Sequence, residues 1–295
     1  MNGADKGFLL LMCHLGDYCR NVLSTAQFHE LTRRVASAKR IISDRQLAHE
    51  DLTAMGYSQA FAERIITLLS DETRLRIYVQ NGADAGCLPI TRANSEYPIL
   101  LRKRLGLDSP CCLWLKGNAD LLKCPAVALV GSRDLRDENK AFAEYAGKQI
   151  AEQGYVLISG NARGADRTAQ EACLAAGGNV ICVIADNLCR QADDPRILYI
   201  SEQGYDAAFT AQRAHSRNRI IHALGTGVLV AQSSLGKGGT WHGTKNNLRN
   251  HFSQVKVFDD GSEAACQLVN HGAQYVDESD LNDLAGLFSQ SCSLF

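Results

Sequence analysis

The sequence predicts an α/β protein in which a mainly parallel sheet is covered by helices on both faces and follows a small helical domain. Two observations support this prediction. After residue 125, five near-continuous apolar runs alternate with amphipathic stretches, which is typical of βαβ units whose strands are buried on both faces. In the first ninety residues, apolar side chains instead recur at helical spacing.

The helical N-terminal domain is expected over residues 1–90. Its apolar positions at helical spacing are Phe28, Leu31, Val35 and Ala38, then Phe61, Ile65, Ile66 and Leu69. Between the two groups, Gly56 and Ser58 indicate a turn and a helix N-cap. Such a unit could be a helix hairpin that contacts a nucleic-acid backbone. A packing module without a ligand is the interpretation we favour.

The second domain is expected over residues 91–295. Tyr97-Pro98 begins an extended or turn segment, and Pro110 precedes a short apolar strand at Cys111–Leu115. The main strands are expected at Ala126–Val130, Tyr155–Ser159, Asn179–Ile184, Gly227–Ala231 and Val255–Phe258. The helices are expected at Glu138–Gln153, Ala165–Ala176, Ala207–Ala223 and Thr240–Asn250. Residues 263–295 hold five Asp or Glu and no Lys or Arg, so the domain ends in a short acidic extension.

Composition excludes several classes of protein. With 45% hydrophobic and 21% charged residues, the chain is neither largely disordered nor fibrous. The early apolar run from Phe8 to Cys13 is too short for a membrane span and lacks the flanks of a signal peptide, so we expect a cytoplasmic protein with no membrane partner. The eleven cysteines contain no C-x-x-C pair, so we expect reduced thiols and no metal site. The net charge of −1 means that any nucleic-acid site must be a local cluster of cations.

Four polar segments follow predicted strands, where ligands bind in open α/β sheets. Gly131-Ser132-Arg133 follows the first strand and could hold a phosphate, or could be a plain turn with a surface arginine. Ser159-Gly160 and Arg163-Gly164 open the next helix, where an anion is favoured. Asp166 there could cap the helix or serve a sugar site.

The other two segments lie in the second half of the sheet. Arg217-Asn218-Arg219 lies in a helical stretch, where the two arginines cannot share one face; one could line the cleft while the other braces a loop. Lys237-Gly238-Gly239-Thr240 precedes a helix and is either a phosphate cradle or a flexible loop. Together the four segments place five cations near one rim, a pocket for polyanions: Arg133, Arg163, Arg217, Arg219 and Lys237.

These segments also resemble a known family. In order, the chain contains Tyr97-Pro98, Leu115-Lys116-Gly117-Asn118, Gly131-Ser132-Arg133, Ser159-Gly160, Ala162-Arg163-Gly164, Asp166, Ser201-Glu202 and Arg217-Asn218-Arg219-Ile220-Ile221. Over residues 90 to 260 it resembles the DprA/Smf family of DNA-processing proteins. The resemblance implies an extended Rossmann-like fold, sequence-independent binding of single-stranded DNA and its delivery to a RecA-type recombinase during DNA uptake. It also implies a homodimer, no cofactor and no catalytic residues.

Carried over residue by residue, the resemblance implies that Gly131, Ser132, Arg133, Ser159, Gly160, Arg163, Gly164, Arg217, Asn218 and Arg219 form the DNA-phosphate pocket. Lys237, Gly238, Gly239 and Thr240 would add contacts from the glycine loop. The chain departs from the family pattern where Gln170 replaces a histidine and where Phe258–Gly261 replaces V-P-G. A C-terminal winged helix is not expected.

Two alternatives use the same cleft. Gly238-Gly239-Thr240 also resembles the loop of the cytokinin-activating phosphoribohydrolases, which place a catalytic glutamate three residues after the threonine. Gly243 occupies that position here, so the carboxylate that would stabilise an oxocarbenium-like centre is missing; Glu202 could replace it only from another strand. We therefore expect a binding protein and not an enzyme. The remaining alternative is a nucleotide-sensing module in a defence system, without turnover.

Overall fold

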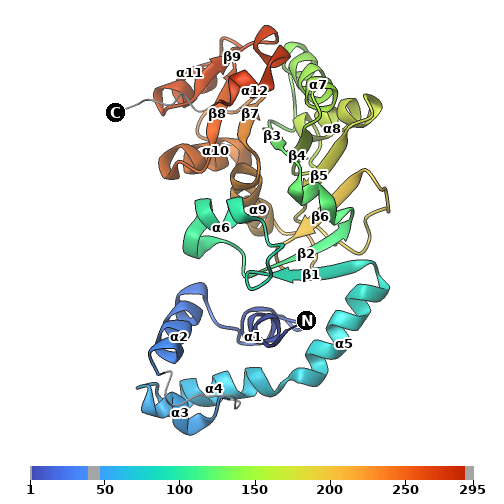
Figure 1. Cartoon of the computed structure of the whole chain (residues 1–295). Helices are drawn as coiled ribbons and strands as arrows, with labels where there is room; N and C mark the ends of the chain where they lie inside the picture. The colour runs from blue at the N-terminus through green and yellow to red at the C-terminus, as the bar shows by residue number, and fades with distance from the viewer. Residues whose placement is uncertain (1, 39–46, 290–295) are drawn as a thin grey trace.

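The computed structural model describes residues 2–38 and 47–289, which form a nine-stranded sheet between two layers of helices, with further helices beyond its β1 edge (Figure 1). In chain order the strands are β1 (Cys87–Thr91), β2 (Cys112–Gly117), β3 (Ala126–Val130), β4 (Val156–Ser159), β5 (Asn179–Val183), β6 (Ile197–Ser201), β7 (Gly227–Val230), β8 (Gln254–Phe258) and β9 (Gln274–Val276). Their order in the sheet is β1-β2-β6-β5-β4-β3-β7-β8-β9.

Seven neighbouring strands, from β6 to β9 in that order, run parallel, whereas β2 pairs antiparallel with β6 and β1 antiparallel with β2. The predicted α/β class is therefore confirmed. The five predicted main strands correspond to β3, β4, β5, β7 and β8, each within one residue of its expected bounds.

Three strands were not predicted: β1, β6 and β9. The most instructive is β6, which is parallel to β5 although residues 184–196 between them contain no helix. A search for strands that alternate with amphipathic helices therefore passes over it. β1 and β9 are the two edge strands, and their residues do not form long apolar runs.

The helices of the sheet domain form two layers. They are α6 (Ile99–Leu105), α7 (Asp137–Glu152), α8 (Ala165–Ala175), α9 (Ala211–Leu224), α10 (Gly238–Asn250), α11 (Glu263–Asn270) and α12 (Leu284–Leu287), with 3-10 turns at Gly106–Asp108, Ala119–Lys123 and Ser279–Asn282. The alternation of β3 separates the two cores: Val127 and Leu129 pack with α7 and α8, whereas Ala128 packs with α6, α9 and α10. Figure 1 shows these layers on opposite sides of the sheet. No helix in the described ranges could cross a membrane.

The N-terminal helices are α1 (Gly3–Met12), α2 (Thr25–Ser37), α3 (His49–Ala54), α4 (Gln59–Ser70) and α5 (Glu72–Asp84). As predicted, Ser58 caps α4, since its side chain accepts a hydrogen bond from the Phe61 amide at 3.3 Å, and Gly56 turns the chain with φ +85°. These helices share a core of their own. They also pack on the sheet, where Tyr78 of α5 meets the Trp114 ring edge-on at 5.2 Å. Because β1 spans residues 87–91, the sheet contains residues on both sides of the expected boundary at 90/91, and the division into domains stays a prediction.

Candidate nucleic-acid interface

The candidate site lies where the order of the strands reverses. Successive strands from β3 to β6 extend the sheet in one direction, and β7 to β9 extend it in the other. A crevice is expected outside the carboxyl ends of the strands at such a switch point. There the structure has a cavity of about 500 Å³ lined by the loops after β3 and β7 and by α9 and α10. A second cavity of about 570 Å³ lies beside it and shares Arg133, Phe209 and Arg217 with it. We call them the main and the adjoining cavity.

The loop after β3 is fixed by backbone groups. The amide of Ser132 donates to the carbonyl of Gln232, after β7, at 3.0 Å. The hydroxyl of Thr240, in the first turn of α10, donates to the carbonyl of Gly131 at 2.9 Å. A side chain at Gly131 would overlap the methyl group of Ala165. The loop is therefore held against three other elements, and the direction of Arg133 is set by well-packed backbone.

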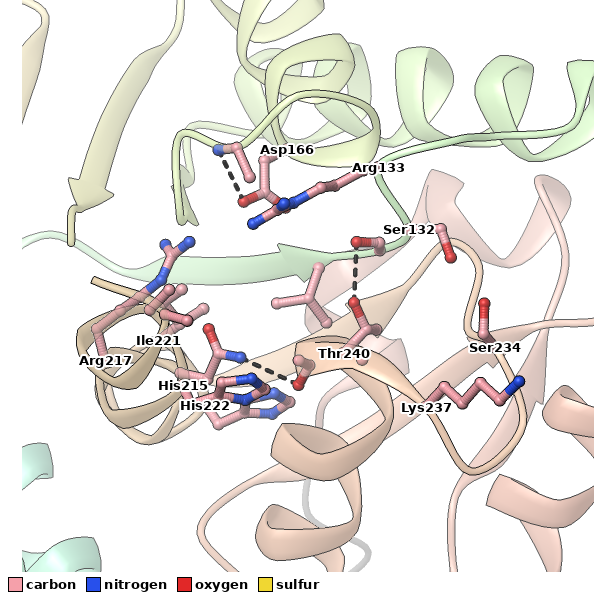
Figure 2. Close-up of a pocket in the computed structure, with 18 of the residues that line it drawn as sticks. Ser132, Arg133, Asp166, His215, Arg217, Ile221, His222, Ser234, Lys237 and Thr240 are labelled. Carbon is pink, nitrogen blue, oxygen red and sulfur yellow. Dashed lines mark hydrogen bonds between the residues drawn. The ribbon is translucent and has the colours of Figure 1, made fainter. Parts of the chain in front are cut away.

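Arg133 is the exposed cation of this loop. Figure 2 shows its guanidinium directed toward Asp166 across the top of the main cavity. In residues 2–38 and 47–289, no carboxylate lies within ion-pair distance of it and no hydrogen bond is formed by its side chain. Its donors are therefore available to a ligand, and a guanidinium can bind a phosphate with two parallel hydrogen bonds.

Asp166 organises the loop after β4. Its side chain is buried and accepts hydrogen bonds from the amides of Gly160, at 3.0 Å, and Ala162, at 3.2 Å. Burial raises the pKa of Asp166, while Arg217, the two amides and Arg133 oppose the rise. The carboxylate thus ties residues 160–162 to the start of α8, and its negative charge faces cations and amides.

Arg217 forms the floor between the two cavities. It is only 8% exposed, and its Nη1 donates to the carbonyl of Val183 at 2.6 Å. Its guanidinium lies so close to Gly160 that any side chain there would overlap it. The Nε of Arg217 has no hydrogen-bond partner among the described residues. Arg217 lines both cavities, and a buried arginine whose position is already fixed can stabilise an anion at low cost in reorganisation.

The start of α10 forms the opposite wall. Lys237 is exposed and precedes the helix, and Gly238 has φ +81°. The amide of the Asn218 side chain donates to the carbonyl of Gly239 at 3.0 Å, which joins α9 to α10. The first-turn amides of α10 lack partners within the helix and carry partial positive charge. Arg133, Arg217, Lys237 and the first turn of α10 thus line one cavity. Figure 2 shows Lys237 at its edge, with the ammonium directed away from the two arginines.

Five of the expected residues lie outside the main cavity, and one of them, Gly160, lines only the adjoining cavity. Arg163 lines only the adjoining cavity, and its Nη2 forms an exposed ion pair with Asp134 at 2.7 Å. Arg219 lines neither cavity; it pairs with Glu202 at 2.8 Å, so the expected rim of five cations is corrected to exclude it. Ser159 is fully buried and accepts a hydrogen bond from Gln170. Gly164, with φ +85°, faces the carbonyl groups of residues 132 and 133.

Comparisons with known proteins show the family of this chain. Residues 89–285, more than half of the chain, match the family described as DNA recombination-mediator protein A. The chain belongs to the DprA/Smf family. It is 34% identical over 182 residues to the DNA processing protein DprA of Streptococcus pneumoniae, covering 57% of this chain and 64% of that protein, which is less than two thirds of its length. It is 28% identical over 208 residues to DprA of Bacillus subtilis, covering 65% of this chain and 69% of that protein.

Solved structures of DprA/Smf proteins share the fold. The crystal structure of S. pneumoniae DprA superposes with a TM-score of 0.68 and 25% identity, covering 89% of this chain and 98% of that one. The structure of DNA processing protein A from Helicobacter pylori, a study of its single-stranded DNA binding mode, gives a TM-score of 0.55 and 23% identity over 68% of this chain and 94% of that one. The extended Rossmann-like fold implied by the family resemblance is therefore confirmed.

Sequence reasoning did not find Phe209, although it lines both cavities of this DprA/Smf protein. Its side chain is 53% exposed, unusual for a phenylalanine. Its loop is held by the buried Arg213, whose Nη1 donates to the carbonyls of Ala185, Ala207 and Ala208 at 2.8, 2.7 and 2.6 Å. The only signal in the sequence is one aromatic residue among alanines ahead of α9, and it does not indicate exposure.

The position of the missing glutamate leaves little room for a side chain. A side chain at Gly243 would start 3.2 Å from both the Cβ of Asn218 and the Nε2 of His222. His222 is buried, which lowers its pKa to about 4, and its Nδ1 lies 3.1 Å from the Asn247 amide. Glu202, the other carboxylate considered, is bound to Arg219 and Ser216 and lines neither cavity.

Proposed function

We propose that the chain binds single-stranded DNA without base specificity, as a DNA-processing protein that delivers the strand to a RecA-type recombinase during DNA uptake and recombination. The observation that supports this most strongly is the convergence of Arg133, Arg217, Lys237 and the first turn of α10 on one cavity of about 500 Å³. These groups recognise phosphates, which every nucleotide has. The relatives named DNA processing protein DprA support the same role.

Phe209 supports the choice of a single strand. An exposed aromatic side chain at the junction of the two cavities can stack on any base, and such stacking is open only to unpaired bases. A homodimer and binding without turnover are parts of the same proposal. The missing carboxylate at Gly243, where little room is left for a side chain, supports the absence of turnover.

The test compares oligo-dT, duplex DNA and free nucleoside monophosphates as ligands across a salt series. We expect oligo-dT to bind best, with log Kd changing by about 0.7 per phosphate contact for each tenfold change in salt. A preference for duplex, or a flat salt dependence, would overturn the proposal. Release of free base from a monophosphate would instead indicate the phosphoribohydrolase-like alternative, and tight binding of a monophosphate alone would indicate the nucleotide sensor.

A further inference from the structure

Three basic side chains form a stripe on the outer face of α10. His242, Lys245 and Arg249 are spaced by three and four residues, which places them on one side of the helix. The opposite side packs on the protein, where Trp241, Thr244 and Asn247 are buried. His242 and Arg249 are exposed and Lys245 is partly exposed. We call these three residues the α10 stripe.

The α10 stripe has no acidic partners. In the part of the chain that the structure describes, its members form no ion pair and no side-chain hydrogen bond, and the only contact of the Lys245 ammonium of this kind is with the Trp241 ring, 5.5 Å from its centroid. The reason lies in composition. The helices α6, α9 and α10 together hold eight Lys or Arg residues and no Asp or Glu.

The helices on the other side of the sheet have a different balance of acidic and basic residues. Together α7 and α8 hold six Asp or Glu residues and three Lys or Arg residues. The lysines of α7 pair along the helix, Lys140 with Glu144 at 3.7 Å and Lys148 with Glu152 at 3.5 Å. Both lysines of α7 therefore have a carboxylate partner, whereas Lys245 and Arg249 of α10 have none among the described residues.

The α10 stripe follows the candidate site along the same helix. The first residues of α10 line the main cavity, and Arg249 lies eleven residues further along the helix, about 16 Å at 1.5 Å per residue. Successive members of the stripe are about one turn apart. A flexible polyanion that leaves the cavity beside Lys237 would meet these side chains in order, and no existing ion pair would have to be broken.

We infer that the α10 stripe binds the phosphates of nucleotides outside the main cavity, so that a bound single strand continues along α10. This inference rests on the proposed function. It adds a second, purely electrostatic segment to the binding surface, used only by strands longer than the cavity can hold.

The test uses the full chain with Lys245→Gln and Arg249→Gln combined, and two ligands: oligo-dT of about four nucleotides and oligo-dT of about sixteen. We expect the variant to bind the long ligand about tenfold more weakly, with a salt slope reduced by about 1.4 for two lost phosphate contacts. Binding of the short ligand should not change. The matched control, Lys140→Gln with Lys148→Gln on α7, removes the same charge and should leave both affinities unchanged.

The remaining outcomes of this experiment would each contradict the inference about the α10 stripe. Equal losses for both ligands, or no loss for the long one, would overturn the stripe while leaving the proposed function intact. Equal losses in the control would mean that only net charge matters, which also overturns it. If the unmodified chain binds neither ligand, the proposed function fails and the stripe with it. Because Lys245 contacts Trp241, Arg249→Gln alone is the second variant; it should reduce the slope by about 0.7 without changing the melting temperature.

Discussion

Two loops beside the main cavity, which we call its first and second walls, use glycine for different physical reasons. In the loop after β4, a side chain at Gly160 would overlap Arg217, and one at Gly164 would overlap the carbonyls of residues 132 and 133. In the loop after β7, Gly236 and Gly238 have positive φ angles, but nothing lies within 4 Å of where their side chains would start. The first wall needs glycine for close packing, and the second needs it only for the course of the backbone.

Each wall also has a buried titratable group beside it, and the pKa shifts of these two groups have opposite effects on stability as the pH changes. Beside the first wall, the pKa of Asp166 is raised by burial, so the stability it contributes is lost as pH rises through that pKa. Beside the second wall, the pKa of His222 falls from 6.5 to about 4, so its contribution is present above 6.5 and lost as pH falls toward 4. One wall is therefore packed around the carboxyl group of Asp166 and the other around the neutral imidazole of His222.

The largest expected effect comes from Gly164→Val. A β-branched residue is strained at φ +85°, and its Cβ would displace the backbone of residues 132 and 133. Strain and overpacking together should lower the free energy of unfolding by about 4 kcal/mol, and oligo-dT affinity should fall with it because Arg133 moves. Thermal denaturation and binding are measured on the same sample.

The control for that variant is Gly177→Val, after α8. Gly177 has a similar φ of +82° but open space around it. Valine there introduces backbone strain without the steric overlap expected at Gly164. Its stability should fall by only about 1–3 kcal/mol, with no change in affinity. Equal effects of the two variants would mean that close packing around Gly164 adds nothing to the backbone strain.

The next effect is a pH dependence that His222 contributes. Between a pH of about 7 and about 4, the unmodified chain should lose about 2–3 kcal/mol more of its free energy of unfolding than His222→Gln loses, because the buried imidazole must become protonated. Denaturant titrations at both pH values measure the difference. His215→Gln, an exposed histidine of the same helix, is the control and should follow the unmodified chain. Parallel curves for His222→Gln and the unmodified chain would contradict the assignment.

A moderate effect on binding is expected from Arg133→Ala. Arg133 is exposed and unpaired among the described residues, so the loss should appear in binding, while the melting temperature stays the same. Affinity for oligo-dT should fall about tenfold and the salt slope by about 0.7, equally for different base sequences. A sequence-dependent loss would indicate that the loop after β3 reads bases.

The smallest effect is expected from Arg163→Gln. The Arg163 and Asp134 side chains are 75% and 88% exposed, and such a surface pair contributes less than about 1 kcal/mol. Affinity for oligo-dT should change by less than about twofold. An affinity loss equal to that of Arg133→Ala would contradict this expectation. It would mean that DNA binds in the adjoining cavity too and that the main cavity is not the principal site.

Local sequence predicted much of the fold and part of the site. The runs that became β3, β4, β5 and β7 are largely apolar on both faces, and only burial between two helical layers satisfies such runs. The run that became β8 carries Lys256 on one face. Because the carboxyl ends of parallel strands meet at one edge, the loops that begin at Gly131 and Lys237 could be expected beside the same crevice.

The tertiary structure alone decided which side chains remain free. Arg163 and Asp134 are 29 residues apart, and Arg219 and Glu202 are 17 apart, so nothing in the local sequence distinguishes these paired arginines from the unpaired Arg133. The same is true of Phe209, whose exposure depends on three carbonyls bound by Arg213. Hydrophobic periodicity is a property of neighbours along the chain, whereas an ion pair depends on a distance of a few ångströms between segments that only the folded sheet brings together.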